Sequence, residues 1–285
     1  MRINQTSLTA TGIALARAVE SEKPAEERIC YDPYARQFVP TWMYHVLGFF
    51  IRSGYAELRG PGVIDFLLIR ERYIDDVLQN FISNGLQQLV ILGAGYDSRA
   101  YRFDLSGLLK IFEVDHPATQ ADKLVKLRVI FGKIPEHVCY VPIEFMSQTL
   151  EGCLMEYGYD PKLKTLFIWQ GVTMYLNADT VDETLAFVAK SSGPGSAIIF
   201  DYVYQGVLNG IQKHREIINM RRYRFMTGEG ITFGIPEGTI EVFLMQRGFQ
   251  SVKDVSMDGL KAAYFIGNNK ERAVIDGYGL VIGYL

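Results

Sequence analysis

After Gly85 the chain alternates short apolar runs with longer helical patterns, and this alternation constrains its fold most strongly. Five runs read as buried strands: QLVILGAG from Gln88, LLKIFEVD from Leu108, HVCYVPIEF from His137, LKTLFIWQG from Leu163 and SAIIFDY from Ser196. Helical patterns separate several of them, notably at residues 118–131 and 178–191. Strands that alternate with helices form βαβ units with parallel pairing. We therefore expect an α/β fold with a mostly parallel, Rossmann-like sheet that carries helices on both faces.

Three other segments flank this core of residues 86–202. Residues 1–85 read as a helical N-terminal cap, with apolar residues at spacings of three and four from Val63 to Ile82. Residues 203–238 break the alternation with a basic stretch, QKHREIINMRRYRFM, and read as an inserted cap over the substrate. In residues 239–285 we expect FQSVKDVS and AAYFIGN to form an antiparallel pair, with YGLVIGYL as a candidate further strand. The expectation is one domain over residues 1–285 with a seven-stranded sheet.

Bulk composition disfavours several classes of partner. The 285 residues carry a net charge of −3, so no basic field favours nucleic acid or an anionic membrane. The apolar runs fall far short of the ~20 residues that a membrane helix needs. The three cysteines have neither CxxC nor zinc spacing, and the N-terminus lacks the pattern of a signal peptide. We expect a cytoplasmic protein with no metal site and no nucleic-acid or membrane partner.

The turn GAGYDSR after the first strand is the first candidate binding site. Gly93 and Gly95, with Ala94 between them, let the chain turn tightly and let a ligand approach the backbone. The dinucleotide fingerprint GxGxxG has a third glycine where this chain has Ser98, which weakens the case for a bound pyrophosphate. The GxG pair alone is a weak signal that also occurs in turns without a ligand.

Asp115 ends the second strand, twenty positions after Gly95. An acid at this place accepts hydrogen bonds from ribose hydroxyls. Asp115 is also placed to cap a helix that starts near Pro117, and the two roles are compatible. These residues predict a ribose-bearing ligand without a need for a diphosphate, and S-adenosylmethionine is such a ligand.

A set of short motifs occurs in order along residues 10–205. They are ALARAVES, YDPYARQFV, RERYIDD, LGAGYDSRAYRF, FEVDHPATQ and WQGVTMYL, with FDY at the end of the fifth strand. The ordered set resembles the leucine carboxyl methyltransferase family, a branch of the class I S-adenosylmethionine-dependent methyltransferases. The resemblance implies an S-adenosylmethionine-dependent O-methyltransferase that acts on a carboxylate or hydroxyl of a small molecule or peptide.

The resemblance also implies which residues hold the cofactor. By their matching positions they are Arg70, Gly93, Ala94, Gly95, Asp115, His116, Glu144, Phe145 and Gln170. Arg70 would hold the methionine carboxylate, because a planar guanidinium makes bidentate contacts. Arg72 is the neighbouring candidate and Arg17 a further cation. The glycine turn would form the floor under the cofactor, and Asp115 would bind its ribose.

This sequence departs from the family pattern at two of those positions. The family usually has an aspartate where Glu144 stands, and Glu144 can still accept a bond from the adenine amine while Phe145 packs on the ring. A strand-end glutamate beside a core phenylalanine is an equal alternative. The family usually has a glutamate at Gln170, which attracts the amine of the methionine moiety. A charge-assisted bond is roughly twice as strong as a neutral one, so Gln170 predicts weaker cofactor binding or lost activity.

The identity of the acceptor depends on whether a general base is present. Methyl transfer from a sulfonium is an in-line displacement, and a carboxylate acceptor needs no base. Among the four histidines only His214, in the insertion, is placed to face a substrate, so no catalytic residue is assigned. This favours a carboxylate acceptor. Tyr175 and Tyr202, after the fourth and fifth strands, are substrate candidates that also suit a packing role.

Two other function classes stay open. One is a nicotinamide-dependent oxidoreductase, against which Ser98 and the segment around Arg70 speak. The other is a non-catalytic module that binds S-adenosylmethionine, which Gln170 alone supports. A nucleic-acid methyltransferase is disfavoured, because no NPPY-type tetrad follows the fourth strand.

Overall fold

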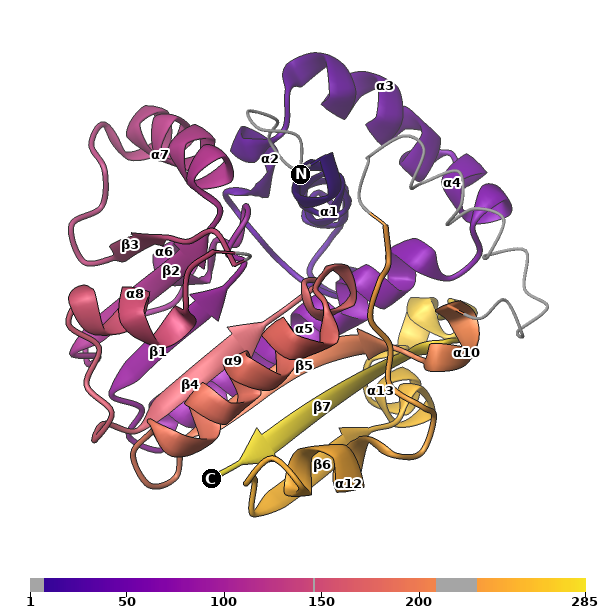
Figure 1. Ribbon diagram of the computed structural model, residues 1–285. Coiled ribbons are helices and arrows are strands. Elements are labelled where there is room, and N and C mark those ends of the chain that lie inside the picture. Colours follow the sequence, from indigo (N-terminus) through magenta and orange to yellow (C-terminus); the bar gives the residue numbers. More distant parts are fainter. Residues whose placement is uncertain (1–7, 146, 209–229) are drawn as a thin grey trace.

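A seven-stranded sheet forms the centre of the protein (Figure 1), in a computed structural model that describes residues 8–145, 147–208 and 230–285. Its strands are β1 (Gln88–Leu92), β2 (Lys110–Asp115), β3 (Cys139–Pro142), β4 (Thr165–Trp169), β5 (Ala197–Val203), β6 (Ser251–Val255) and β7 (Tyr278–Tyr284). Their order is β3-β2-β1-β4-β5-β7-β6. Strands β1 to β5 are mutually parallel, and β7 is antiparallel to both of its neighbours. The predicted mostly parallel sheet is confirmed.

Helices cover both faces of the sheet, as predicted. Those with core side chains on one face are α5 (Val63–Ser83) and α13 (Met257–Tyr264), and those on the other are α8 (Leu150–Glu156), α9 (Ala178–Lys190) and α12 (Ile240–Met245). Successive residues of a strand point to opposite faces. Leu89 and Ile91 of β1 therefore pack with α5, whereas Val90 and Leu92 pack with α8 and α9.

Residues 1–85 were predicted to be helical, and the part that the structure describes, from residue 8 on, does form helices. They are α1 (Leu8–Glu20), α2 (Ala35–Phe38), α3 (Thr41–Arg52) and α4 (Tyr55–Arg59), followed by α5. The first three share an apolar cluster with α7 (Pro117–Phe131). In Figure 1 they lie beyond the carboxyl ends of β1 and β4, the edge at which parallel sheets bind ligands.

The remaining short elements complete the connections between the strands. They are α6 (Arg99–Arg102), η1 (Thr173–Tyr175), α10 (Gln205–Leu208) and η2 (Gly267–Asn269). Three of these follow a strand in the chain, and α10 comes after β5. Helix α6 comes after the glycine turn of β1, and η1 comes after the end of β4.

One predicted strand is wrong. AAYFIGN overlaps the end of helix α13, and β6 pairs with β7 instead. The apolar spacing explains the helix, because Leu260 and Tyr264, four residues apart, both pack against the core. Ser256 begins the helix, since its Oγ accepts a hydrogen bond from the backbone N–H of Gly259 at 3.1 Å.

The predicted insertion at residues 203–238 is described only at its two ends. After β5 the chain forms α10, and near the other end of the insertion Ile235 forms a β-bridge with Tyr204. The backbone N–H of Thr232 donates to the carbonyl of Met174 at 2.8 Å, which ties this end of the insertion to η1. The basic stretch and His214 lie outside the described residues.

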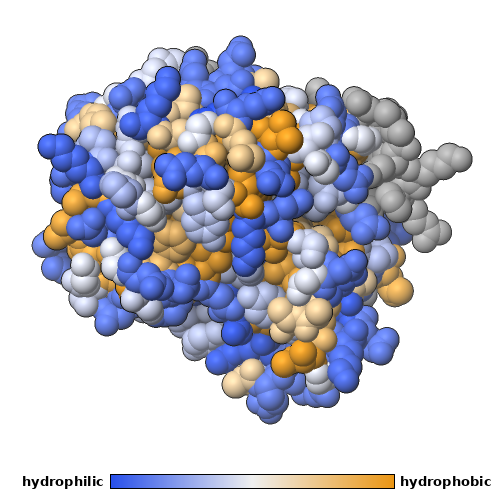
Figure 2. Space-filling model, turned by 90° about the horizontal axis from the view of Figure 1, so that it is seen from below, coloured by the Kyte–Doolittle hydropathy of each residue, from blue (hydrophilic) through white to orange (hydrophobic). Residues whose placement is uncertain are grey.

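The surface of the described residues is mixed in character. On the face seen in Figure 2, hydrophobic and hydrophilic residues alternate in small areas. Within the described ranges, no helix combines the length and the apolar character needed to cross a membrane. In the same part of the chain, no three His, Cys, Asp or Glu side chains are grouped so that they could hold a metal ion.

Candidate functional site

The glycine turn lies at the carboxyl end of β1. Gly93 and Gly95 have φ angles of 64° and 44°, in the left-handed region that favours glycine. A Cβ at Gly93 would lie 2.3 Å from Cγ2 of Val172, and one at Gly95 would lie 3.2 Å from Cβ of Ala10. The space left by the missing side chains is thus partly taken up by the protein itself. The glycines bring α1 and the loop after β4 close to the turn.

Asp115, at the end of β2, faces the same turn. Its Oδ2 accepts a hydrogen bond from the backbone N–H of Gly95, and its Oδ1 accepts one from the N–H of His116 at 2.6 Å. Burial raises the pKa of the Asp115 carboxyl, and these two hydrogen bonds oppose that rise. Each carboxylate oxygen accepts more than one hydrogen bond, so capacity remains for ribose hydroxyls.

The predicted helix-capping role of Asp115 is wrong. Helix α7 is capped by His116, whose Nδ1 accepts a hydrogen bond from the backbone N–H of Ala118 at 3.2 Å. Pro117 occupies the first turn, where its missing N–H costs nothing. The carboxylate of Asp115 therefore contacts the glycine turn and not the helix. The imidazole of His116 is hydrogen-bonded to the backbone of α7.

Arg70 is buried on α5, with 2% of its surface exposed. Its Nη1 forms an ion pair with Oδ2 of Asp201, which is fully buried on β5. Its Nε and Nη2 are buried and have no hydrogen-bond partner among the described residues. A Cβ at Gly171 would lie 3.5 Å from Nη1 and 3.7 Å from Nη2, so the guanidinium faces the backbone directly after β4. Two buried donors without partners are costly unless a ligand satisfies them.

The side-chain amide of Gln170 is held at both ends. Its Oε1 accepts a hydrogen bond from Nη1 of Arg99 at 2.9 Å, and its Nε2 donates to Oε2 of Glu71 at 2.9 Å. A guanidinium only donates and a carboxylate only accepts, so these partners determine the orientation of the amide. Gln170, the neutral residue predicted near the cofactor amine, is thus hydrogen-bonded to the buried carboxylate of Glu71.

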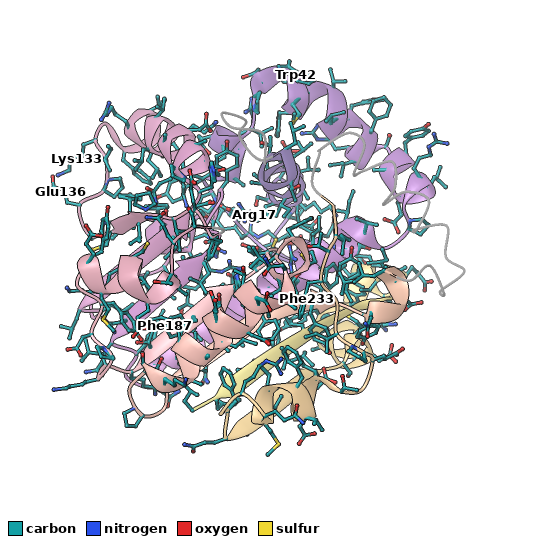
Figure 3. All side chains as sticks on the ribbon, in the orientation of Figure 1. Arg17, Trp42, Lys133, Glu136, Phe187 and Phe233 are labelled. Atoms are coloured by element: carbon teal, nitrogen blue, oxygen red, sulfur yellow. The ribbon has the colours of Figure 1, made fainter. Side chains whose placement is uncertain are left out.

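Glu71 lies at the centre of a group of buried charges, which we call the charge cluster. Its members are Arg17, Asp32, Glu71, Asp75, Asp97, Arg99 and Arg102. The side chains of these residues are at most 11% exposed, and Figure 3 shows Arg17 in the interior of the molecule. Burial would raise the pKa of the Glu71 carboxyl, but Arg99, Arg17 and Arg102 lower it well below its usual range. Glu71 is therefore ionised at neutral pH.

The predicted adenine-side residues lie after β3. Glu144 is exposed, and its backbone N–H donates to Oε1 of Gln148 at 3.0 Å. Phe145 is half-buried against the core and lines a hollow of 320 Å³ between α8 and α9.

The structure separates the remaining candidates. Tyr202 is 1% exposed, and a Cβ at Gly279 would lie 2.6 Å from its hydroxyl, so its position favours the packing role. Tyr175 is half-buried in η1, against a cluster that includes Val203. Arg72 points to the surface of α5, where its Nε pairs with Asp76 at 2.9 Å. Arg72 therefore does not share the environment of Arg70.

Most of the charge cluster was not predicted from the sequence. No role in binding was assigned to its members Asp32, Glu71, Asp75, Asp97, Arg99 and Arg102, nor to Asp201, which pairs with Arg70 outside the cluster. One signal for it exists, because Glu71 and Asp75 stand four residues apart on the same face of α5 as the apolar Leu68 and Ile74. Charges on a helix face that is otherwise apolar indicate a buried ionic network, because buried charges require partners.

With this geometry in place, the chain can be compared with known proteins. The sequence profile described as leucine carboxyl methyltransferase matches residues 10–189. The protein belongs to the leucine carboxyl methyltransferase family. One relative is YktD from Bacillus subtilis, which is named as an S-adenosyl-L-methionine-dependent methyltransferase. Its sequence is 31% identical to this chain over 72% of this chain and 67% of its own length. A relative of Streptomyces avermitilis with the same description is 31% identical over 70% of each chain.

A solved structure agrees with the fold. A crystal structure described as a methyltransferase from Thermobifida fusca covers 98% of this chain and 95% of its own chain, with a TM-score of 0.56 and 14% sequence identity. Membership of the leucine carboxyl methyltransferase family makes this protein an S-adenosylmethionine-dependent methyltransferase. Of the function classes left open by the sequence, the comparisons support this one over the nicotinamide-dependent oxidoreductase.

Proposed function

We propose that this methyltransferase acts on an oxygen atom, most readily that of a carboxylate in a small molecule or peptide. We also propose that it binds S-adenosylmethionine at the carboxyl ends of β1, β2 and β4. The observation that carries the binding site is Arg70, whose buried guanidinium has two nitrogens without a partner among the described residues. An anionic group of the cofactor would satisfy them, and S-adenosylmethionine carries such a carboxylate.

The residues around Arg70 would hold the other parts of the cofactor. Asp115 would accept hydrogen bonds from the ribose hydroxyls beside Gly95. Gln170 would present its Oε1 to the amine. Glu144 would accept a bond from the adenine amine beside Phe145. When bound, the cofactor supplies an electrophilic methyl group on a sulfonium, and these contacts hold that group in position for transfer.

The described histidines support an acceptor that needs no base. His116 caps α7, Nε2 of His137 lies 2.9 Å from the carbonyl oxygen of Ala100, and His45 is exposed on α3. His116 and His137 are thus engaged with the backbone, and His45 is exposed to solvent. A carboxylate is already ionised at neutral pH and attacks without proton transfer, whereas an alcohol or phenol needs a base.

A calorimetric titration tests the cofactor site. We expect S-adenosylmethionine and S-adenosylhomocysteine to bind and NAD not to bind. Asp115→Asn should lower the affinity for both sulfur ligands about tenfold, because it removes a charged acceptor of ribose hydroxyls. Asp104→Asn is the matched control, since Asp104 is exposed and, among the described residues, its carboxylate accepts hydrogen bonds from Ser106. Binding of NAD alone would refute the proposal. Cofactor binding without turnover over a panel of carboxylic acids would refute the carboxylate acceptor.

Cofactor affinity should also depend on pH through Asp115. The ionised carboxylate accepts the ribose hydroxyls, and the pKa of Asp115 is raised by burial. Affinity should therefore fall as the pH is lowered through this raised pKa, above the ~3.9 of an ordinary aspartate. A raised pKa also means that ionising Asp115 costs stability above that pKa. Asp115→Asn removes this cost but leaves the N–H of either Gly95 or His116 without its acceptor, so the two effects on the free energy of unfolding oppose each other at pH 7. Calorimetric titrations from pH 4 to 8 on the original protein and on Asp115→Asn measure how cofactor affinity depends on pH in each.

A further inference from the structure

We propose that Glu71 is a positioning residue that supplies the negative charge for the amine of the bound cofactor, acting through the amide of Gln170. The inference rests on the proposed binding site. It adds a residue that sequence reasoning did not assign. It also gives the neutral Gln170 a specific role, as the part of a two-residue acceptor that contacts the ligand.

The geometry of the amide is the first argument. Nε2 of Gln170 donates to Glu71 and Oε1 accepts from Arg99, both at 2.9 Å. A reversed amide would bring its NH₂ group against the guanidinium of Arg99 and its oxygen against the carboxylate of Glu71, so both partners oppose reversal. A carbonyl oxygen accepts two hydrogen bonds, so Oε1 of Gln170 retains one for a ligand. Glu71 and Arg99 together therefore keep an acceptor at the end of β4.

The charge balance is the second argument. The charge cluster contains three guanidinium groups and four carboxylates, so it carries one negative charge in excess. Glu71 is held ionised by Arg99, Arg17 and Arg102. Hydrogen bonds in a chain polarise one another, so a donor bond to Glu71 increases the electron density on Oε1 of Gln170. A buried excess of negative charge favours a cationic ligand over a neutral one.

The hydrogen bond between Glu71 and Gln170 implies that the carboxylate and the amide can be exchanged between these two positions. With Glu71→Gln and Gln170→Glu together, the local count of carboxylates and amides is unchanged. Gln170→Glu alone would place two carboxylates at hydrogen-bond distance, and such pairs share a proton. The single change should therefore make ligand affinity depend on pH near neutrality, which the double change should not.

The test compares two ligands that differ only in the amine. They are S-adenosylhomocysteine and its desamino analogue, in which hydrogen replaces the amino group. In calorimetric titrations of the full chain, Glu71→Gln should weaken S-adenosylhomocysteine about tenfold and leave the analogue unchanged. The double variant should bind S-adenosylhomocysteine within about threefold of the original protein. A merely structural role of Glu71 would change both ligands equally.

Asp75→Asn is the matched control. Asp75 pairs with Arg99 and Arg102 in the same cluster, and no bond joins it to Gln170. It removes the same charge from the cluster as Glu71→Gln but leaves the bond between Glu71 and the Gln170 amide in place. It should therefore reduce the preference for the amine-bearing ligand clearly less than Glu71→Gln does, and an equal reduction would overturn the role given to the amide. The inference is overturned if Glu71→Gln changes the affinities for both ligands equally, or changes neither affinity. If that single variant does not fold, a double variant that fails to prefer the amine overturns it. Failure of the original protein to bind either ligand would instead refute the proposed function, and this inference with it.

Discussion

The buried charged groups beneath the proposed site, here called the floor, and the helices α2, α3 and α4 with the start of α5, here called the cap, are built in opposite ways. The floor buries charge, with the charge cluster and the pair of Arg70 and Asp201 beneath the ends of β1 and β4. The cap exposes apolar side chains. On α3, α4 and the start of α5 these are Trp42, Val46, Leu47, Phe49, Phe50, Tyr55, Leu58 and Val63. Figure 3 shows the contrast, with Arg17 in the interior and Trp42 at the outer edge of α3.

The difference shows where the chain tolerates change. A buried charge is stable only with its partners, so each member of the floor depends on several others. An exposed apolar side chain contributes little to folding, because most of its surface remains in water. Single substitutions should therefore have large effects in the floor and small effects on the outer face of the cap.

The largest effect is expected at the pair of Arg70 and Asp201. Arg70→Met leaves the carboxylate of Asp201 buried without its cation, although the backbone N–H of Gly171 still donates to it at 2.6 Å. Breaking a buried pair in this way costs about 3–5 kcal/mol. The free energy of unfolding, measured by urea denaturation, should fall by that amount.

A second variant separates stability from binding. Arg70→Met with Asp201→Asn removes both charges and keeps an acceptor for Gly171, so most of the stability should return. Cofactor affinity should not return, because the guanidinium proposed to hold the carboxylate is absent. A double variant that binds S-adenosylhomocysteine as tightly as the original protein would contradict the role given to Arg70.

An intermediate effect is expected at the glycine turn. Gly93→Ala has to adopt a φ of 64° and places Cβ 2.3 Å from Cγ2 of Val172. Gly85→Ala is the control, because Gly85 has a φ of 78° but a Cβ added there would have nothing within 4 Å. The control should cost about 1–2 kcal/mol for its backbone alone. Gly93→Ala should cost more because of the clash, and equal losses in thermal or urea unfolding would show that Val172 moves freely.

The parallel sheet and the glycine turn at its edge could be predicted because they rest on local patterns. Apolar runs, glycines and Asp115 each occupy a short stretch, and their spacing indicates their place in a βαβ unit. The partners of Arg70 and Gln170 could not be predicted in this way. Asp201 lies 131 residues from Arg70 and Glu71 lies 99 residues from Gln170, so only folding brings them together. Helix α13 was missed because a short apolar stretch fits either period.

The smallest effect is expected on the outer face of α3. Phe49 is 62% exposed, so Phe49→Ala should change the free energy of unfolding by no more than about 0.5 kcal/mol and leave the affinity for S-adenosylhomocysteine unchanged. Phe38, on neighbouring α2, is fully buried in the same cap, so Phe38→Ala should cost about 3–5 kcal/mol. Urea denaturation of the two variants gives the comparison directly. A loss above about 2 kcal/mol for Phe49→Ala would contradict the exposure of this face, and would mean that the cap is buried in solution as firmly as the floor.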